Sequence, residues 1–121
     1  MFIPIKPVPK PRMTQSDRWK GRPAVLRYHA FSDELRRSYP HKLPPTILLV
    51  FLMPIPASWS KRKRLAHANQ PHQQKPDIDN LCKAVMDALA PDDDSYIFSI
   101  DATKFWSITP GIHIRSLEEY E

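Results

Sequence analysis

The sequence contains very little glycine and cysteine. Two glycines and one cysteine occur among its 121 residues, against fourteen prolines. The lone Cys82 cannot form a disulfide within the chain, and no cysteines and histidines have the spacing of a zinc site. We therefore interpret Cys82 as a small, partly buried helix residue. The prolines separate short apolar segments, so they punctuate a folded chain and do not mark a disordered tract.

Long hydrophobic runs are also absent. No apolar stretch approaches the roughly 18 residues that a membrane-spanning helix needs. Residues 1–12 lack the apolar core of a signal peptide. We therefore expect no membrane association and a cytoplasmic location. The content of 41% hydrophobic and 26% charged residues is typical of a globular protein, and the length predicts a single domain over residues 1–121.

Acidic residues are scarce in the first part of the chain. Residues 1–75 contain 15 Lys/Arg and 3 Asp/Glu, whereas residues 76–121 contain 3 Lys/Arg and 10 Asp/Glu. Such a division indicates a basic surface that binds a polyanion beside an acidic centre. A solvated charged surface without a ligand is the alternative.

The spacing of apolar residues predicts a small sheet with flanking helices. Helices are expected at 25–39, 58–69 and 80–90, and strands at 1–5, 46–53, 95–106 and 111–118. Ser58 or Ser60 could cap the second helix, and Asp79 is expected to cap the third. The resulting order, β-α-β-α-α-β-β, predicts a single-domain α+β (mixed α/β) fold.

Two aspartates form a D-x-D pair at residues 77–79. Alternate side chains of an extended backbone point to the same side, so Asp77 and Asp79 would face one site while Ile78 turns into the core. Pro76 favours this extended interpretation, with the helix starting only after Asp79. Adjacent carboxylates repel each other unless a proton or a cation neutralises them.

Carboxylate oxygens are hard ligands, so the expected cation is Mg²⁺ or Mn²⁺. One of Asp92, Asp93 and Asp94 could supply a third ligand, and Lys83, one turn after Asp79, could stabilise charge on a phosphoryl transition state. In the alternative, Asp79 only caps a helix, Lys83 is solvated and residues 92–94 form a polar turn.

A bare D-x-D is a weak signal. Nucleotide-sugar transferases use one, and so do haloacid-dehalogenase-type phosphatases, but the phosphatase motif requires a threonine where this chain has Leu81. Neither class explains the basic first part of the chain.

Longer motifs resemble those of the RusA family of Holliday-junction resolvases, which is common in phages and prophages. The resemblance covers most of the chain and rests on "PVPKPR", "SWSKRKR", "KPDIDNLCKAVMDAL" and "DDS" before a strand. It implies a RusA-like fold, metal-binding roles for Asp77, Asp79 and Asp94, and an essential role for Lys83. The chain departs from the family pattern in having only "AP" between "DAL" and the paired acids, which leaves Asp93 possible in place of Asp94.

The resemblance also implies an activity. Family members are homodimeric, Mg²⁺-dependent endonucleases, with Mn²⁺ as a substitute, and they nick four-way DNA junctions in pairs in the cytosol of bacteria or phage-infected hosts. A C2 dimer suits two matched cuts across a two-fold junction. We therefore expect a junction-resolving enzyme of DNA recombination and repair. The alternatives are a non-catalytic or degenerate junction-binding protein and a small enzyme acting on a nucleotide or sugar-phosphate.

Several cations are candidates for DNA contacts. Such contacts bind phosphates without reading sequence. The candidates are Lys10, Arg12, Lys61, Arg62, Lys63, Arg64 and Lys75. Trp59 could stack on a base, or it could pack under its own helix. The five histidines are interpreted as surface or structural residues, with DNA contacts as the alternative for His67 and His72.

Overall fold

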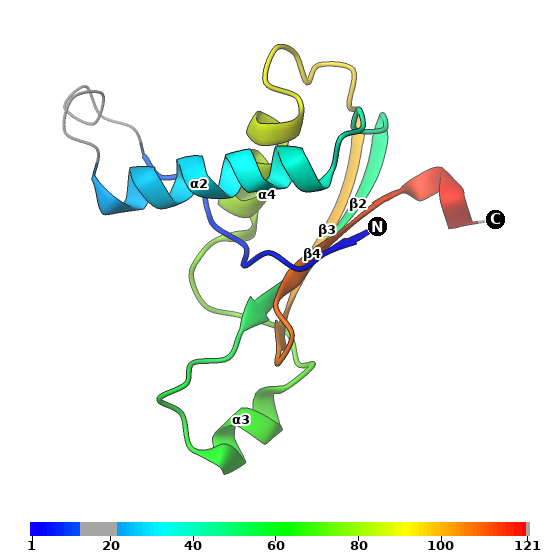
Figure 1. Cartoon of the computed structure of the whole chain (residues 1–121). Coiled ribbons are helices and arrows are strands. Elements are labelled where there is room, and N and C mark those ends of the chain that lie inside the picture. Colours follow the sequence, from blue (N-terminus) through cyan, green and yellow to red (C-terminus); the bar gives the residue numbers. More distant parts are fainter. Residues whose placement is uncertain (13–21, 121) are drawn as a thin grey trace.

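A computed structural model describes residues 1–12 and 22–120 of the chain. The elements follow in the order β1 (Phe2–Ile3), α2 (Pro23–Ser38), β2 (Thr46–Pro54), α3 (Lys61–His67), α4 (Ile78–Leu89), β3 (Ser99–Ser107), β4 (Gly111–Ser116) and a final 3₁₀ turn, η1 (Leu117–Tyr120). The predicted order of strands and helices and the α+β class are confirmed (Figure 1). Within these residues, no helix has the length and apolar content to cross a membrane.

The four strands form one mixed sheet in the order β1-β4-β2-β3. The central strand β2 is parallel to β3 and antiparallel to β4. Its alternate residues Ile47, Leu49 and Phe51 are fully buried in the core. Gly111 opens β4 directly beneath the Phe2 ring, and a Cβ atom at Gly111 would overlap that ring. The close approach of β1 to β4 therefore requires one of the two glycines.

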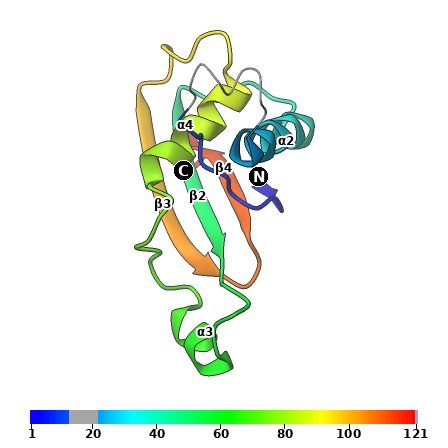
Figure 2. The ribbon, with the colours of Figure 1, turned by 90° about the vertical axis from the view of Figure 1, so that its left-hand side faces the viewer.

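Helices α2 and α4 cover the same face of the sheet (Figure 2). The predicted apolar positions of α2 are buried, because Tyr28, Phe31 and Leu35 belong to the core. The Nε of Arg36 donates a hydrogen bond to the carbonyl oxygen of Ala88 at 2.9 Å, which joins α2 to the last turn of α4. The sheet thus has one helix-covered face, and α4 is held firmly on it.

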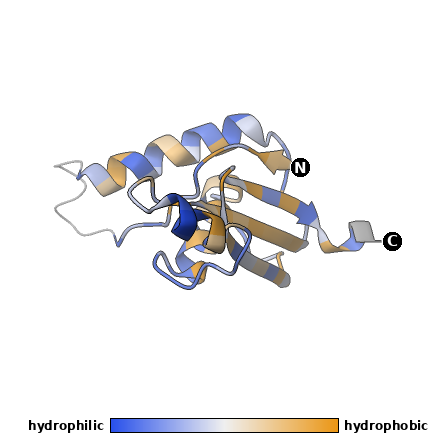
Figure 3. Ribbon diagram, turned by 90° about the horizontal axis from the view of Figure 1, so that it is seen from below, coloured by the Kyte–Doolittle hydropathy of each residue, from blue (hydrophilic) through white to orange (hydrophobic). Residues whose placement is uncertain are grey.

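Helix α3 lies beyond the end of the sheet, away from α2 (Figures 1 and 2). It has no buried residue, and its ribbon is strongly hydrophilic whereas the strands are largely hydrophobic (Figure 3). Ser60 caps it by accepting a hydrogen bond from the backbone N–H of Lys63 at 3.2 Å, which decides between the two serines considered as caps. After α3 the chain returns along the edge of β3, with His72 N–H donating to the Lys104 carbonyl at 3.0 Å.

Most predicted boundaries differ from the observed ones by one or two residues, and the starts of two elements differ by more. The strand expected from residue 95 begins at Ser99, because the partner strand β2 begins at Thr46 and is preceded by Pro44 and Pro45, which have no N–H to donate to a ladder. The helix expected over 58–69 is restricted to α3, which is shorter at both ends. In each case the pairing or the cap, and not the apolar pattern, decides where the element ends.

Candidate active site at the start of helix α4

Asp77, and not Asp79, occupies the N-cap of α4. Asp77 has an extended backbone with φ −68° and ψ 146°, and Ile78 is the first helical residue. The prediction that Asp77 and Asp79 share an extended segment is therefore wrong. A single extended residue after Pro76 is enough to start the helix, because proline restricts the residue before it and leaves the following ones free.

The Asp77 side chain makes no capping hydrogen bond. An aspartate at this position normally accepts a hydrogen bond from the second or third helical N–H. Asp79 lies in the first turn, and both residues are exposed. The helix dipole stabilises both carboxylates here. The start of α4 therefore presents two exposed carboxylates, of which Asp77 is not used to cap the helix.

Lys104 of β3 supports the loop that leads into Asp77. Its Nζ donates hydrogen bonds to the carbonyl oxygens of Gln74 at 2.6 Å and Pro76 at 2.7 Å. Burial lowers the pKa of Lys104, and the negative charge of Asp77 acts in the opposite direction. Lys104 was not among the predicted site residues, although a lysine on the core-facing side of a predicted strand is a detectable signal.

Two cavities lie on either side of the acidic pair along the chain. One, of about 400 Å³, includes Pro76 in its lining, and the other, of about 450 Å³, includes Asn80. The segment from Lys6 to Arg12 borders both cavities. Residues 6–9 line the cavity that includes Pro76, and residues 10–12 line the cavity that includes Asn80. Asp77 and Asp79 lie between Pro76 and Asn80 in the chain, although neither acid is part of either lining.

The second cavity gathers three predicted functional residues. Lys10, Arg12 and Lys83 line it together with Pro11 and Asn80. Lys83 is exposed, four residues and about one helical turn after Asp79. This cavity is positively charged and of a size that suits an anion such as a phosphate group.

Lys10 also has a structural partner. Its Nζ forms an ion pair with Asp87 of α4, and its backbone N–H donates to the Asn80 carbonyl at 3.2 Å. The hydrogen bond that Lys10 donates to Asp87 raises the pKa of Lys10. Asp87 lies on the polar face of α4, and the contact with Lys10 places the N-terminal segment over this residue. Lys10 thus anchors this segment to α4.

Asp93 and Asp94, in the acidic turn after α4, make different contacts. Oδ1 of Asp93 accepts a hydrogen bond from the backbone N–H of Ser95 at 2.9 Å. Hydrogen bonding by the Ser95 side chain first, and by this N–H second, lowers the pKa of Asp93. Asp94 uses its backbone carbonyl to accept from Ile97 N–H at 3.0 Å. No contact of the Asp94 carboxylate is found within residues 1–12 and 22–120. The turn geometry favours Asp94 over Asp93 as a carboxylate available for a ligand.

The donor atoms of these aspartates suit a hard divalent cation, because they are exposed or half-exposed carboxylate oxygens. In the part of the chain that is described, no three Asp, Glu, His or Cys side chains are close enough to hold one metal ion. Asp77, Asp79 and Asp94 are therefore not brought into one group. A metal at the start of α4 would take ligands from Asp77 and Asp79, with the remaining positions open to water or substrate oxygens.

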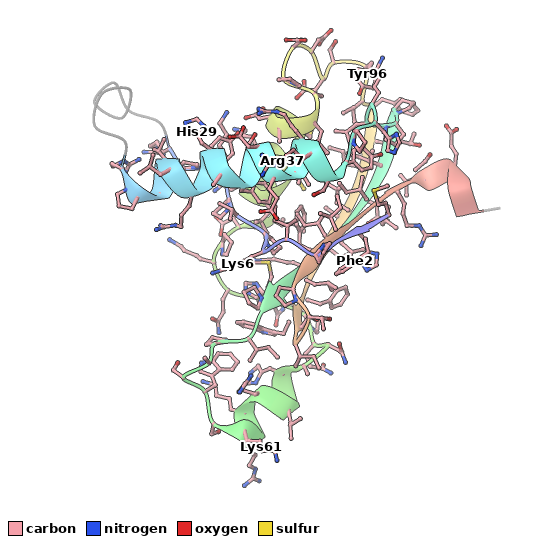
Figure 4. The ribbon with its side chains drawn as sticks, in the orientation of Figure 1. Phe2, Lys6, His29, Arg37, Lys61 and Tyr96 are labelled. Carbon is pink, nitrogen blue, oxygen red and sulfur yellow. The ribbon has the colours of Figure 1, made fainter. Side chains whose placement is uncertain are left out.

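The other predicted cations lie on two surfaces. Lys75 is exposed and lines the first cavity. Lys61, Arg62, Lys63 and Arg64 are all exposed on α3, and Lys61 marks the free end of the molecule in Figure 4. The basic block of α3 is thus separate from the second cavity.

Aromatic rings attach α3 to the sheet. The Trp59 ring lies 4.7 Å from that of His67 and 4.9 Å from that of Trp106, and Lys63 Nζ lies 4.1 Å from the Trp59 centroid. The interpretation of Trp59 as a residue packed against its own helix is confirmed. His72 completes the group, with its ring 4.2 Å from Trp106. We call Trp59, His67, His72 and Trp106 the aromatic cluster.

Comparison with known proteins gives one match. The family model described as endodeoxyribonuclease RusA matches residues 4–116 of the 121-residue chain. No curated protein and no solved structure matches. The matched range includes the acidic pair, the linings of both cavities, the basic block of α3 and the strands β2, β3 and β4. A match of this extent supports a nuclease and implies the resolution of Holliday junctions.

Proposed function

Because the chain belongs to the endodeoxyribonuclease RusA family, we propose that it is a Mg²⁺-dependent, structure-selective DNA endonuclease. It resolves four-way junctions by paired symmetric nicks in DNA recombination and repair. The observation that carries this proposal is the pair of exposed carboxylates at the start of α4, Asp77 without a capping hydrogen bond and Asp79 in the first turn. Their neighbours in the chain, Pro76 and Asn80, line two cavities with cationic linings. Cations attract the phosphates of DNA, and the acids provide the ligands for a divalent ion.

The residues of the chain have separate roles in this reaction. Asp77 and Asp79 hold Mg²⁺, with Mn²⁺ as a substitute, and Asp94 is the proposed further ligand. When bound, such an ion would supply hydroxide from water and would offset negative charge on the leaving oxygen. Lys83 stabilises negative charge on the reacting phosphate from one turn further along α4. Lys104 acts as a positioning residue, since it binds the backbone that precedes Asp77.

DNA binding involves a longer surface than the cleavage site. Arg12 and Lys75 contact phosphates near the acids, and the four cations of α3 contact a more distant part of the same DNA. Lys10 contributes charge to this surface while it is paired with Asp87. Because all of these contacts are to phosphates, we expect affinity to fall steeply with salt and to depend little on sequence.

We propose a homodimer as the active form. A four-way junction has two-fold symmetry, and a C2 dimer offers two equivalent sites for the two nicks. Sedimentation of the protein with one junction should give two chains per DNA.

A cleavage assay on a synthetic four-way junction tests the proposal. With Mg²⁺ we expect two symmetric nicks, and with EDTA we expect binding without cleavage. A linear duplex of the same sequence serves as the control and should be neither bound as tightly nor cut. Cleavage that persists in EDTA, or equal cleavage of the duplex, would contradict the proposal.

One observation favours a second candidate, a junction-binding protein without activity. Three acidic side chains do not gather within the described residues, and the link between α4 and the acidic turn is short. Such a protein would shift the junction in a gel with Mg²⁺ and with EDTA, and it would cut in neither.

A further inference from the structure

The cavity on the Pro76 side of the acids has rigid, largely apolar walls. Five prolines line it, namely Pro7, Pro9, Pro54, Pro56 and Pro76, together with Val8 and Met53. Proline fixes its own backbone angle, so walls built from it change little on binding. The volume of about 400 Å³ lies within the range of small-molecule sites. The cavity is therefore suited to a flat, mostly apolar group.

Two members of the aromatic cluster, His72 and Trp106, also line this cavity. Both are buried, with 5% of their surface exposed. Burial lowers the pKa of His72, and the charge of Lys104 lowers it further. Among the described residues, His72 Nδ1 has no hydrogen-bond partner. This nitrogen is itself inaccessible, so it is not offered to a ligand, and the lining to which His72 and Trp106 contribute is mainly apolar.

The lining of this cavity also includes basic residues. Lys6, Arg27 and Lys75 line the same cavity and are exposed. Lys6 lies between α2 and the end of β2 (Figure 4). Among residues 1–12 and 22–120, no acidic residue is part of the lining. The site thus combines an apolar slot with a positive rim, which matches a planar ring attached to an anion.

We propose that this cavity binds one nucleobase that has left the base stack of branched DNA, while Lys6, Arg27 and Lys75 bind its flanking phosphates. Bases at a branch point are unstacked at lower cost than bases within a duplex. A base held here fixes the strand next to Asp77, because Pro76 is part of the cavity wall. The inference rests on the proposed function and adds a site that selects branched over linear DNA.

A matched pair of variants tests the site. Gln74 lines the cavity and is exposed, and its neighbour Gln73 is exposed and not part of the lining. Gln74→Trp places an indole at the cavity, whereas Gln73→Trp adds the same group outside it. The backbone carbonyl of Gln74 that binds Lys104 is retained in both variants. Thermal melting verifies that both variants fold.

Binding is measured in EDTA with intact junctions and with junctions that lack one base at the branch point. Loss of the correct base should weaken the wild-type complex by about fivefold to hundredfold. Gln74→Trp should bind the intact junction more weakly by a similar factor and should not respond to base loss. Gln73→Trp should behave as wild type.

The outcomes distinguish this inference from the proposed function. If the wild type binds and cuts junctions but no single base loss affects it, or if both tryptophan variants are equally impaired, the nucleobase site is wrong and the endonuclease proposal stands. If the wild type does not prefer junctions to duplex, the proposed function fails and the nucleobase site fails with it.

Discussion

The Nζ of Lys104 donates a hydrogen bond to the Pro76 carbonyl at 2.7 Å, so β3 is tied to the residue that precedes Asp77. We expect Lys104→Met to lower kcat for junction cleavage by about tenfold or more, because small displacements of a reacting group are costly. KM should change little, since Lys104 is not proposed to contact DNA. Lys104→Arg, which keeps the charge and the donors, should recover part of kcat. Equal losses in kcat and DNA affinity would contradict a positioning role.

Removal of either acid at the start of α4 should abolish cleavage. We expect Asp77→Asn and Asp79→Asn to lower the cleavage rate by at least about 100-fold, because a lost metal ligand removes several kcal/mol of transition-state stabilisation. Junction affinity in EDTA should stay the same or increase, since a negative charge near the phosphates is lost. Asp101→Asn, which removes an exposed acid from β3, is the control and should cut normally.

The acidic turn provides a test of the third ligand. Asp94→Asn should reduce cleavage and raise the Mg²⁺ concentration needed for half-maximal rate. Asp93→Asn should do neither, because an asparagine oxygen can still accept the hydrogen bond from Ser95 N–H. The reverse result would assign the ligand to Asp93. Normal activity of both variants would exclude the turn from the site.

The basic block of α3 should determine much of the salt dependence. For Lys61→Ala/Arg62→Ala we expect the slope of log K against log salt to decrease by about 0.9 per lost phosphate contact. These two residues are chosen because Lys63 also packs on Trp59. Arg37→Ala/Lys42→Ala removes the same charge elsewhere and should leave the slope unchanged. Equal slopes for both pairs would show that α3 makes no specific contact with DNA.

Acid should destabilise the fold through His72. Its pKa is lowered from 6.5 by burial first and by Lys104 second. The unfolded chain therefore takes up this proton more readily than the folded chain, so stability is retained above pH 6.5 and falls as pH decreases below it. Denaturation at pH 7.5 and 5.5 measures the loss, and His72→Phe should reduce it.

Two other histidines are needed to interpret the pH dependence of stability. His113 also has a pKa lowered by burial, so part of the acid effect should persist in His72→Phe. His41→Phe, at an exposed position, is the control and should leave the full effect. An unchanged pH dependence in His72→Phe would contradict the role of His72.

Most of the architecture could be predicted from the sequence, because it depends on local patterns. The period of Tyr28, Phe31 and Leu35 defines α2, and the proline-bounded apolar run defines β2. The motif around Asp77 identifies the family, and Ser60 was correctly included among the possible caps. These features can be predicted because each depends only on residues that are close together in the sequence.

Some errors are local, such as the extended segment expected over Asp77 and Asp79, but others concern residues whose partners are distant in sequence. Asp87 lies on a polar helix face, yet Lys10, 77 positions earlier, covers it. The strand start at Ser99 depends on the prolines before Thr46. The cavity beside Pro76 joins segments from the N-terminus, β2 and β3. Periodicity carries no information on such pairings.

By itself, the sequence determined the order of the elements, the separation of basic and acidic regions, and the family, because composition and short-range spacing encode these. The tertiary structure decided that Asp77 takes the N-cap without capping, that Lys104 supports it, and that an apolar slot with a cationic rim lies beside it. These properties arise where the sheet, α4 and the N-terminal segment meet, and only folding brings them together.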